Sequence, residues 1–327
     1  MTTEQILNTV NRTKTWRIKE LLRLGHTRIE VANLLNCNYG FVHNVYKSIY
    51  PERIRQTRRI AEVIDDAEWA LTSFEFNHTF GVEIEAYGIK REDLIEDMRA
   101  AGIEIESESY NHQSRSHWKI VGDSSVSGEN SFELVSPKLT GEAGLRELKT
   151  VCIILKGIET KVNRSCGLHI HLDAENFNLQ TWKNLYLNYA KLEPQIDSFM
   201  PNSRRENSNY YLKSNRIDNY ERKINDVNNV QSVENGLRMI QSKFGRDDRY
   251  YKLNSQSYWR HRSVEFRQHS GTVDFKKISN WIMFLSRLVE FSKNAVVSDS
   301  NWSSFQRFLP DELIRYFQER ANQLASN

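Results

Sequence analysis

Three segments that lie far apart in the chain carry residues able to bind metal ions or phosphate, spaced two positions apart. They are Glu83 and Glu85 in the first segment, His169, His171 and Asp173 in the second, and Glu265, Arg267 and His269 in the third. Because successive side chains of a β-strand point to opposite faces, each segment would place its polar set on one face and its apolar residues on the other. The spacing therefore predicts a sheet with an apolar back and a front that carries chemistry.

The residue types indicate what that chemistry would be. Two carboxylates at positions i and i+2 of a strand, such as Glu83 and Glu85, lie roughly 6.5 to 7 Å apart along it. This separation suits two neighbouring hard cations such as Mg²⁺, and the histidines extend the tolerance of the site to Mn²⁺. Arg267, on the face of Glu265, would be a good clamp for a phosphoryl group. The set is typical of a site that binds metal ions and a nucleotide.

The elements that must position these residues follow an irregular order. Strands are predicted at 74–86, 117–121, 131–135, 167–173 and 263–269. Helices are predicted over 91–101, around 145–155, over 178–200, near 232–242 and over 278–288, with a polar segment at 201–230. Strands separated irregularly by helices favour an α+β fold over a doubly wound parallel sheet.

The N-terminal part has a different pattern. Residues 1–52 contain helical periodicity and then two short predicted helices that flank Asn36-Cys37-Asn38, an arrangement that resembles a helix-turn-helix module. Asn36 tolerates the left-handed conformation that such a turn needs. Residues 53–70 are interpreted as a helical linker, and a second domain is predicted over 71–327.

Charge is distributed unevenly along the 327 residues. Residues 1–60 hold 11 Lys or Arg and 4 acidic residues, whereas the remainder holds 34 and 38, for a formal net charge of +3 overall. A basic head on a mildly acidic body suggests that residues 1–60 bind nucleic acid. No stretch approaches the ~18 uncharged apolar residues of a membrane helix. Three widely spaced cysteines without a C-x-x-C pair indicate reduced thiols, as in a cytoplasmic protein.

Four motifs in order resemble the family of putative amidoligases. They are Gly81-Val82-Glu83-Ile84-Glu85, Ser136-Pro137-Lys138-Leu139-Thr140-Gly141 after Glu133, Cys166-Gly167-Leu168-His169-Ile170-His171, and Val264-Glu265-Phe266-Arg267-Gln268-His269-Ser270-Gly271-Thr272. That family is similar to glutamine synthetase and glutamate–cysteine ligase. The resemblance covers about residues 74–295 and implies a curved, mainly antiparallel sheet with helices on its convex face. ATP and two or three divalent ions would lie on the concave face.

The resemblance also implies roles for individual residues. One ion would be held by Glu83, His169 and Glu265, and another by Glu85 and Glu133, with Asp123 as the other candidate for the place of Glu133. Arg267 would stabilise the γ-phosphoryl group during its transfer. For His171, a donor role facing the substrate is favoured.

The implied reaction transfers a phosphoryl group from ATP to a substrate carboxylate, after which an amine displaces phosphate to form an amide. Arg204 and Arg205 lie in a segment similar to the family's variable substrate loop and would bind a carboxylate or a phosphate. Further candidates for contact with nucleotide or substrate are Lys252, Asn254, Arg260, Arg262 and His269. The sequence names neither the carboxylate nor the amine, nor the residue that deprotonates the amine.

Two other interpretations compete with a ligase. His169-x-His171 followed by Glu175 fits the start of a cupin signature, but the expected glycine is absent and Trp182 stands there instead. The second is a nucleic-acid-binding regulator whose ligase-like body only senses a ligand. The basic head favours it, whereas the complete set of acids, histidine and arginine on one predicted face favours an enzyme.

Overall fold

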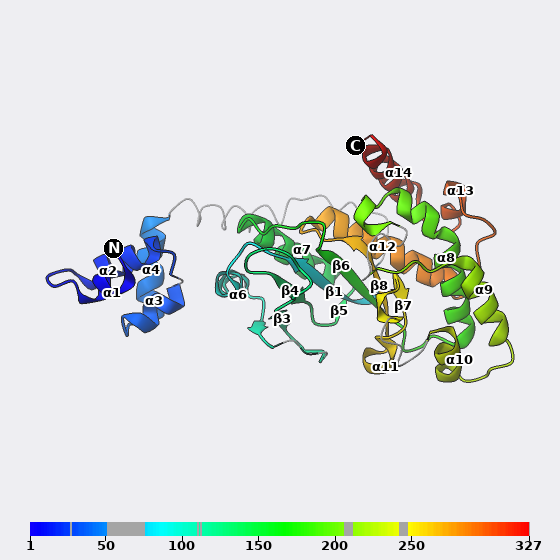
Figure 1. Ribbon diagram of the computed structural model, residues 1–327, viewed down its shortest axis with the longest axis horizontal. Coiled ribbons are helices and arrows are strands. Elements are labelled where there is room, and N and C mark those ends of the chain that lie inside the picture. Colours follow the sequence, from blue (N-terminus) through cyan, green and yellow to red (C-terminus); the bar gives the residue numbers. More distant parts are fainter. Residues whose placement is uncertain are drawn as a thin grey trace.

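The computed structural model describes residues 1–26, 28–50, 76–109, 111, 113–205, 212–241 and 248–326 (Figure 1). The helical linker predicted over 53–70 lies outside these ranges. Among the described residues, every helix is too short or too polar to cross a membrane.

One sheet forms the centre of the larger part of the molecule. Its strands are β1 (Thr79–Ala86), β2 (Ile105–Ser107), β3 (Trp118–Val121), β4 (Phe132–Val135), β5 (Leu139–Thr140), β6 (Gly167–Asp173), β7 (Leu253–Asn254) and β8 (Ser263–Ser270). Their order is β2-β3-β4-β1-β6-β8-β7, with β5 also paired to β1. All described pairs are antiparallel except β2 with β3. The strands β1, β6 and β8, which carry the motif residues, are therefore neighbours.

Alternation along these strands gives the sheet an apolar back. In β1 the even positions Val82 and Ile84 are buried, and in β6 Leu168 and Ile170 are fully buried. The helices α7 (Gly141–Gly157), α8 (Leu179–Ser198) and α12 (Phe275–Ser292) pack on this side and share one hydrophobic core with the strands (Figure 1). Burial of each large apolar side chain contributes about 1.5–3 kcal/mol, so the back is a strong constraint on which face the odd residues must take.

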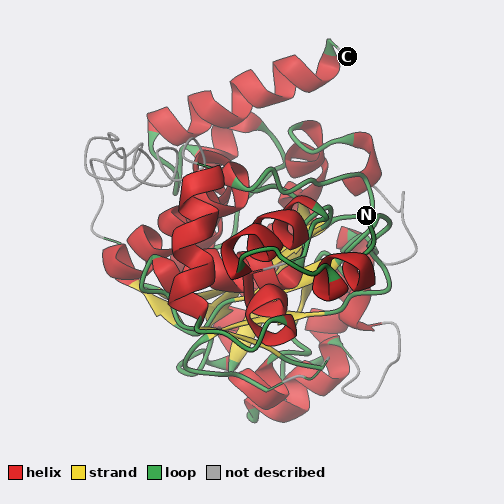
Figure 2. Ribbon diagram, turned by 90° about the vertical axis from the view of Figure 1, so that its left-hand side faces the viewer, coloured by secondary structure: helices red, strands yellow, loops and turns green. Residues whose placement is uncertain are grey.

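The other helices surround this core. They are α6 (Arg91–Ala100), α9 (Ile217–Asp226), α10 (Val233–Ile240), α11 (Tyr258–His261), α13 (Trp302–Phe305) and α14 (Asp311–Ala325), with short 3-10 turns η1 (Asn202–Arg204) and η2 (Asp248–Tyr250). Figure 2 shows the C-terminal helix at the edge of the molecule, away from the strands. The helix α9 lies inside the predicted polar segment 201–230. Its buried residues Tyr220 and Ile224 are too few among polar neighbours to be recognised from the sequence.

Residues 1–50 fold around a hydrophobic core of their own. Their helices are α1 (Thr3–Asn8), α2 (Lys14–Arg23), α3 (Arg28–Leu34) and α4 (Tyr39–Ile49). The core contains Ile6, Ile18, Leu21, Leu22, Val31, Ala32, Val42 and Val45. Arg28 forms ion pairs with Glu96 and Asp97 of α6, which connect these helices to the larger part.

The predicted α+β class and the mostly antiparallel sheet are confirmed. The predicted helical region over 178–200 is one helix, α8, which contains Pro194 within its span. The strand β2 was not predicted, because a strand of three residues is too short to show an alternation.

Candidate active site

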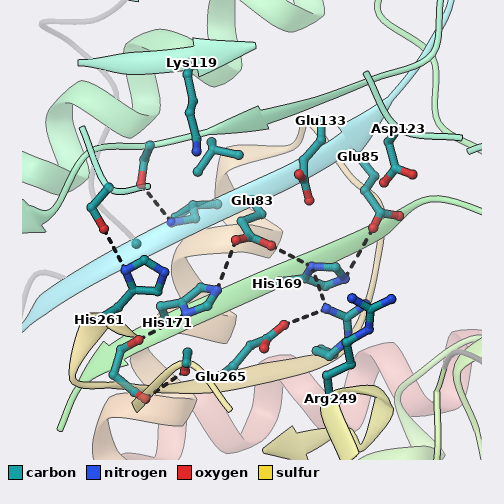
Figure 3. Close-up of a pocket in the computed structure, with 18 of the residues that line it drawn as sticks. Glu83, Glu85, Lys119, Asp123, Glu133, His169, His171, Arg249, His261 and Glu265 are labelled. Atoms are coloured by element: carbon teal, nitrogen blue, oxygen red, sulfur yellow. Dashed lines mark hydrogen bonds and ion pairs between the residues drawn. The ribbon is translucent and has the colours of Figure 1, made fainter. Parts of the chain in front are cut away.

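Strand register brings the predicted polar residues into rows across the front of the sheet. Glu83 of β1 lies opposite His169 of β6, and Glu85 lies opposite Glu133 of β4. His171 lies opposite Glu265 of β8. Because directly opposed residues of paired strands share a face, these side chains converge on the same space (Figure 3).

His169 lies between the carboxylates. Its Nδ1 atom is 3.0 Å from Glu83 Oε2, and its Nε2 atom is 3.4 Å from Glu85 Oε1 (Figure 3). Two groups of potential metal ligands share this imidazole, one with Glu83 and Glu265 and the other with Glu85 and Glu133. Within each group the ligand atoms lie within 4.8 Å of one another. The His169 ring thus joins two adjacent acidic clusters.

The carboxylates of this cluster differ in the direction of their pKa shifts. Burial raises the pKa of Glu133 well above its usual value, and the nearby charges of Glu83 and Glu85 raise it further. Burial also acts to raise the pKa of Glu83, but His171 and His169 outweigh it and leave that pKa well below its usual value. Acids crowded on one face with few cations are costly in the isolated protein and attract a ligand cation.

Arg267 is the guanidinium of this face. Its Nη1 atom is 2.6 Å from Glu265 Oε1 and 3.4 Å from His169 Nδ1. Burial acts to lower the pKa of Arg267, but the charge of Glu265 outweighs it and raises the pKa above its usual value, so the group stays cationic. In turn, the charge of Arg267 is the main influence that lowers the pKa of Glu265 against its burial.

A second guanidinium approaches from the other side of the cluster. Arg204, in η1, is only 4% exposed, and its Nη2 atom donates to the carbonyl oxygen of Cys166. Its Nε atom is buried without a hydrogen-bond partner among the described residues. Burial lowers the pKa of Arg204.

Gly167 explains how Arg204 can reach this place. A side-chain carbon at position 167 would lie 2.7 Å from Arg204 Nη2, 2.9 Å from His169 Nε2 and 3.3 Å from Glu85 Oε2. The space above this glycine is therefore occupied by three functional groups. Its backbone N–H also donates to Glu85 Oε2 at 2.5 Å, which fixes that carboxylate.

The front face opens into a large cavity of about 1660 Å³, whose lining includes many charged side chains. Ligand pockets are typically about 300–1,000 Å³, so this one has room for a nucleotide together with other substrates. Besides the acidic cluster, its lining includes Arg91, Lys119, Asp123, Arg204, Arg249, Trp259, Arg260 and His261.

Asn111 and Ser114, which lie between β2 and β3, line one part of this cavity. The Lys119 Nζ atom donates to the backbone oxygens of Asn111 and Gln113 at 3.1 and 2.8 Å. Ser114 Oγ lies 2.9 Å from Nδ1 of His261 at the end of α11. The Ser114–His261 contact joins two sides of the cavity that are 147 residues apart in the sequence.

The structure thus brings together most of the predicted site residues. Those that line the cavity are Glu83, Glu85, Glu133, His169, His171, Arg204, Arg260, Glu265 and Arg267. Asp123, the alternative to Glu133, also lines it. Glu133 is closer to the cluster, because it is the residue grouped with Glu85 and His169.

Lys252 was predicted to face nucleotide or substrate, and the structure places it on the opposite side of the sheet. It is fully buried, with its Nζ atom 2.8 Å from both Glu193 and Asp197 of α8. A lysine can be buried in this way because the two carboxylates compensate its charge. Its expected place in the cavity is therefore wrong.

The side chain of His269 also lies on the face opposite to the predicted one. The pairing of β6 with β8 shifts between Leu168 and Ile170, so β8 holds one extra residue and its alternation is broken. His269 consequently lies opposite Leu168 on the back, near Trp281 at a ring separation of 5.8 Å. The sequence did not reveal this bulge, and strict alternation gave the wrong face.

Three further predicted residues lie near the site without lining the cavity. Asn254 is buried and donates to Glu265 at 3.1 Å, so it orients a carboxylate of the cluster. Arg262 pairs with Glu234 at 3.5 Å. The Arg205 Nε atom donates to the carbonyl of Met200.

Lys119, Arg249 and His261 line the cavity and were not predicted. For Lys119 a signal existed, because it is the one charged residue in the otherwise apolar strand β3. Arg249 and His261 lie in short irregular elements that have no periodicity, so only the tertiary structure reveals their position.

The donor set fits divalent metal ions. Carboxylate oxygens with one imidazole are ligands that Mg²⁺ and Mn²⁺ accept, and the converging acids carry more negative charge than Arg267 compensates. The ligand groups Glu83–His169–Glu265 and Glu85–Glu133–His169 are each large enough to hold an ion with water or substrate oxygens completing the coordination.

The chain was compared with known proteins. A family model described as a putative amidoligase enzyme matches residues 77–289, about two thirds of the chain. The match begins just before β1 and ends within α12, so it contains every strand of the sheet. No curated protein matches the chain.

Proposed function

The chain belongs to the family of putative amidoligase enzymes, and from that premise we propose that it is an ATP-dependent carboxylate–amine ligase that works through an acyl phosphate. The observation that carries the proposal is the convergence of Glu83, His169, Glu265 and Arg267 on one face of the sheet. A site that only bound a neutral ligand would not need charged groups of both signs in one hollow.

The proposed reaction has two steps. In the first, an oxygen of the substrate carboxylate attacks the γ-phosphorus of ATP, the bond to the bridging oxygen breaks, and ADP leaves. In the second, the amine attacks the carbonyl carbon of the acyl phosphate, the C–O bond breaks, and inorganic phosphate and a proton are released. Phosphorylation is needed because a free carboxylate would have to expel oxide, which is a very poor leaving group.

The protein's contribution to the first step is positioning and charge compensation, as in other phosphoryl transfers. Arg267 is held by Glu265 at 2.6 Å, so its guanidinium is oriented before a substrate arrives. It would bind oxygens of the γ-phosphoryl group as their charge develops. Such preorganised donors act most strongly in a site from which water is excluded.

Arg204 would bind the substrate carboxylate. Its guanidinium is buried at the acidic cluster, with an unsatisfied Nε atom among the described residues, and Gly167 leaves it room next to Glu85. A guanidinium matches a carboxylate in shape as well as charge. His171, beside Glu83, would donate a hydrogen bond to substrate.

Mg²⁺ or Mn²⁺ would be held by the two ligand groups around His169, where it would compensate the charge of the phosphates. Gly167, through its backbone N–H, and Asn254, through its amide, hold Glu85 and Glu265 in place for this role.

The test measures ADP and phosphate release by the full chain with ATP, Mg²⁺ and a panel of carboxylates and amines. Release that requires both a carboxylate and an amine is expected. Alanine at Glu83 or Glu265 should lower the rate by a factor of about 10² or more, as expected when groups that compensate transition-state charge are lost.

Glu312→Ala is the matched control, because Glu312 is an exposed acid in α14, outside the cavity. Its turnover should equal that of the unchanged chain. Binding of ATP without turnover for any carboxylate and amine pair would reject the ligase and favour a ligand-sensing body.

A further inference from the structure

The helices of residues 1–50 play no part in the proposed ligase reaction, since the family match begins at residue 77. We propose that they bind duplex DNA, with the exposed face of α4 placed in the major groove. The proposal is independent of the ligase function and rests on the turn before α4, the side chains on its free face and the charge around it.

The connection between α3 and α4 has the geometry that a helix-turn-helix requires. The chain turns at Asn36, which adopts a positive φ of 43°, and the Cys37 N–H donates to the Ala32 carbonyl at 2.9 Å. Asn38 then caps α4 through its side chain, which accepts from the Gly40 N–H at 2.7 Å. Two helices joined by such a short turn hold the second one rigidly at an angle to the first.

One face of α4 packs inward and the other is free. Val42 and Val45 are buried in the small core. The exposed positions on the other face are Gly40, Phe41, Asn44, Lys47 and Ser48. Among the described residues, neither Asn44 nor Lys47 has a hydrogen-bond or ion-pair partner, so both are available to a ligand.

The types of side chain on this face fit the edges and backbone of DNA. An asparagine amide can bond to both N6 and N7 of adenine, and an exposed phenylalanine can contact the methyl group of thymine. Gly40 has no side chain, which lets the start of α4 approach a base pair closely. Lys47 would bind a phosphate or a guanine.

The charge of the region supports a polyanionic partner. Residues 1–50 contain seven Lys or Arg and three acidic residues, so their net charge is +4. Lys14 lies beside the turn before α4, because its Nζ atom is 3.4 Å from the Asn36 carbonyl. It would reach a phosphate next to the groove that α4 enters. Arg28 is excluded from this surface, because Glu96 and Asp97 pair with it.

The same features argue against other macromolecules. The major groove of B-DNA admits a helix, whereas that of A-form RNA is too deep and narrow. A helix that docks on a protein groove usually presents an apolar stripe at positions i, i+3, i+4 and i+7. Phe41 is the one large apolar side chain exposed on α4 among those described, so a protein partner would have little to bury.

Fluorescence anisotropy of labelled DNA duplexes of mixed sequence, with the full chain, tests the proposal. If Lys14 and Lys47 each neutralise one phosphate, affinity should fall at least roughly tenfold between about 50 and 200 mM salt. Lys47→Ala should weaken binding and reduce the slope of log affinity against log salt by about 1. Asn44→Ala should reduce the preference among duplexes of different sequence.

Lys156→Ala is the matched control, because Lys156 is an exposed lysine of α7 in the larger part of the molecule. Circular dichroism should show all three variants folded. Absence of duplex binding at low salt, or an equal effect of Lys47→Ala and Lys156→Ala, would overturn the proposal. Equal or tighter binding of duplex RNA would also overturn it. Glu83→Ala should leave DNA binding unchanged, which separates this test from that of the ligase.

Discussion

Buried charged groups lie on both sides of the sheet near β7 and β8, but their surroundings differ. On the back, the single ammonium of Lys252 lies between the carboxylates of Glu193 and Asp197 at 2.8 Å, and Gln268 donates a further hydrogen bond to Asp197. On the front, Glu265 belongs to a cluster of carboxylates that face an open cavity. The back is closed, and its charged groups contact one another directly, whereas the carboxylates of the front face an open cavity.

The comparison shows how to tell a structural ion cluster from a functional one. Burying a charge is costly unless partners compensate it, and the Lys252 network meets that condition within the protein. Glu133 on the front does not, since burial and the neighbouring acids raise its pKa. When the free-energy cost of burying a charged group is not compensated within the protein and the group lies beside a cavity, we expect a ligand in the cavity to compensate it.

The largest expected effect is the loss of folding stability when the buried lysine on the back is replaced. Lys252→Met leaves Glu193 and Asp197 buried without their cation, and loss of one partner of a buried ion pair costs about 3–5 kcal/mol. Urea unfolding followed by circular dichroism measures the change. A matched lysine change at the exposed Lys156 should cost less than about 0.5 kcal/mol. A loss below 1 kcal/mol for Lys252→Met would mean that the network is not structural.

At the front the large effect should be on rate. Arg267→Ala removes a guanidinium that Glu265 holds at 2.6 Å, and loss of one preorganised donor at a transition state lowers kcat by about 10²–10³. Steady-state phosphate release gives kcat, and urea unfolding gives stability for the same variant. Arg307, which is exposed and donates to the Val296 carbonyl, offers a control arginine away from the cavity. An unchanged kcat in Arg267→Ala would remove this residue from the phosphoryl site.

The front could be predicted from the sequence because alternation fixes it. Glu83, His169 and Glu265 each lie between two apolar residues. Burial of those apolar neighbours on the back stabilises the fold and therefore directs the three polar side chains to the front. Register between strands could not be predicted, yet it decides that Glu83 meets His169 and that Glu85 meets Glu133. That information lies in contacts between distant segments.

The errors at β8 have a similar origin. The prediction for His269 was wrong because one extra residue forms a bulge in β8. Such a bulge is not visible in the pattern of residue types. The prediction for Lys252 was wrong because this charged residue was assigned to the site on account of its position near a motif. Its partners are Glu193 and Asp197 of α8, which lie more than 50 residues away in the sequence. Only the fold reveals such compensation.

The buried imidazole of His269 on the back allows a test by pH. Burial lowers the pKa of His269 on the back to about 3, so it is neutral in the folded protein. The unfolded chain takes up a proton below its ordinary pKa of about 6.5, and this favours unfolding. This group should therefore cost stability as pH falls from 6.5 towards 3, by about 2 kcal/mol at pH 5.

The measurement is urea unfolding at pH 7 and pH 5 for the unchanged chain and for His269→Asn. Asparagine keeps a donor for the Ser270 carbonyl, which lies 2.7 Å from His269 Nδ1, but cannot titrate. The variant should lose less stability than the unchanged chain between the two pH values. An identical loss in both proteins would show that His269 is not buried in its neutral form.

The smallest expected effect is a gain in folding stability when an acid of the front cluster is replaced. Glu133→Gln replaces an acid whose pKa is raised by burial and by Glu83 and Glu85, so it removes repulsion in the metal-free protein. A gain of about 0.5–2 kcal/mol is expected, a typical exchange of function for stability, together with a loss of phosphate release. Melting curves with and without Mg²⁺ measure it, and Mg²⁺ should raise the Tm of the unchanged chain more than that of the variant. A variant less stable than the unchanged chain without Mg²⁺ would mean that the front, like the back, compensates its own charge.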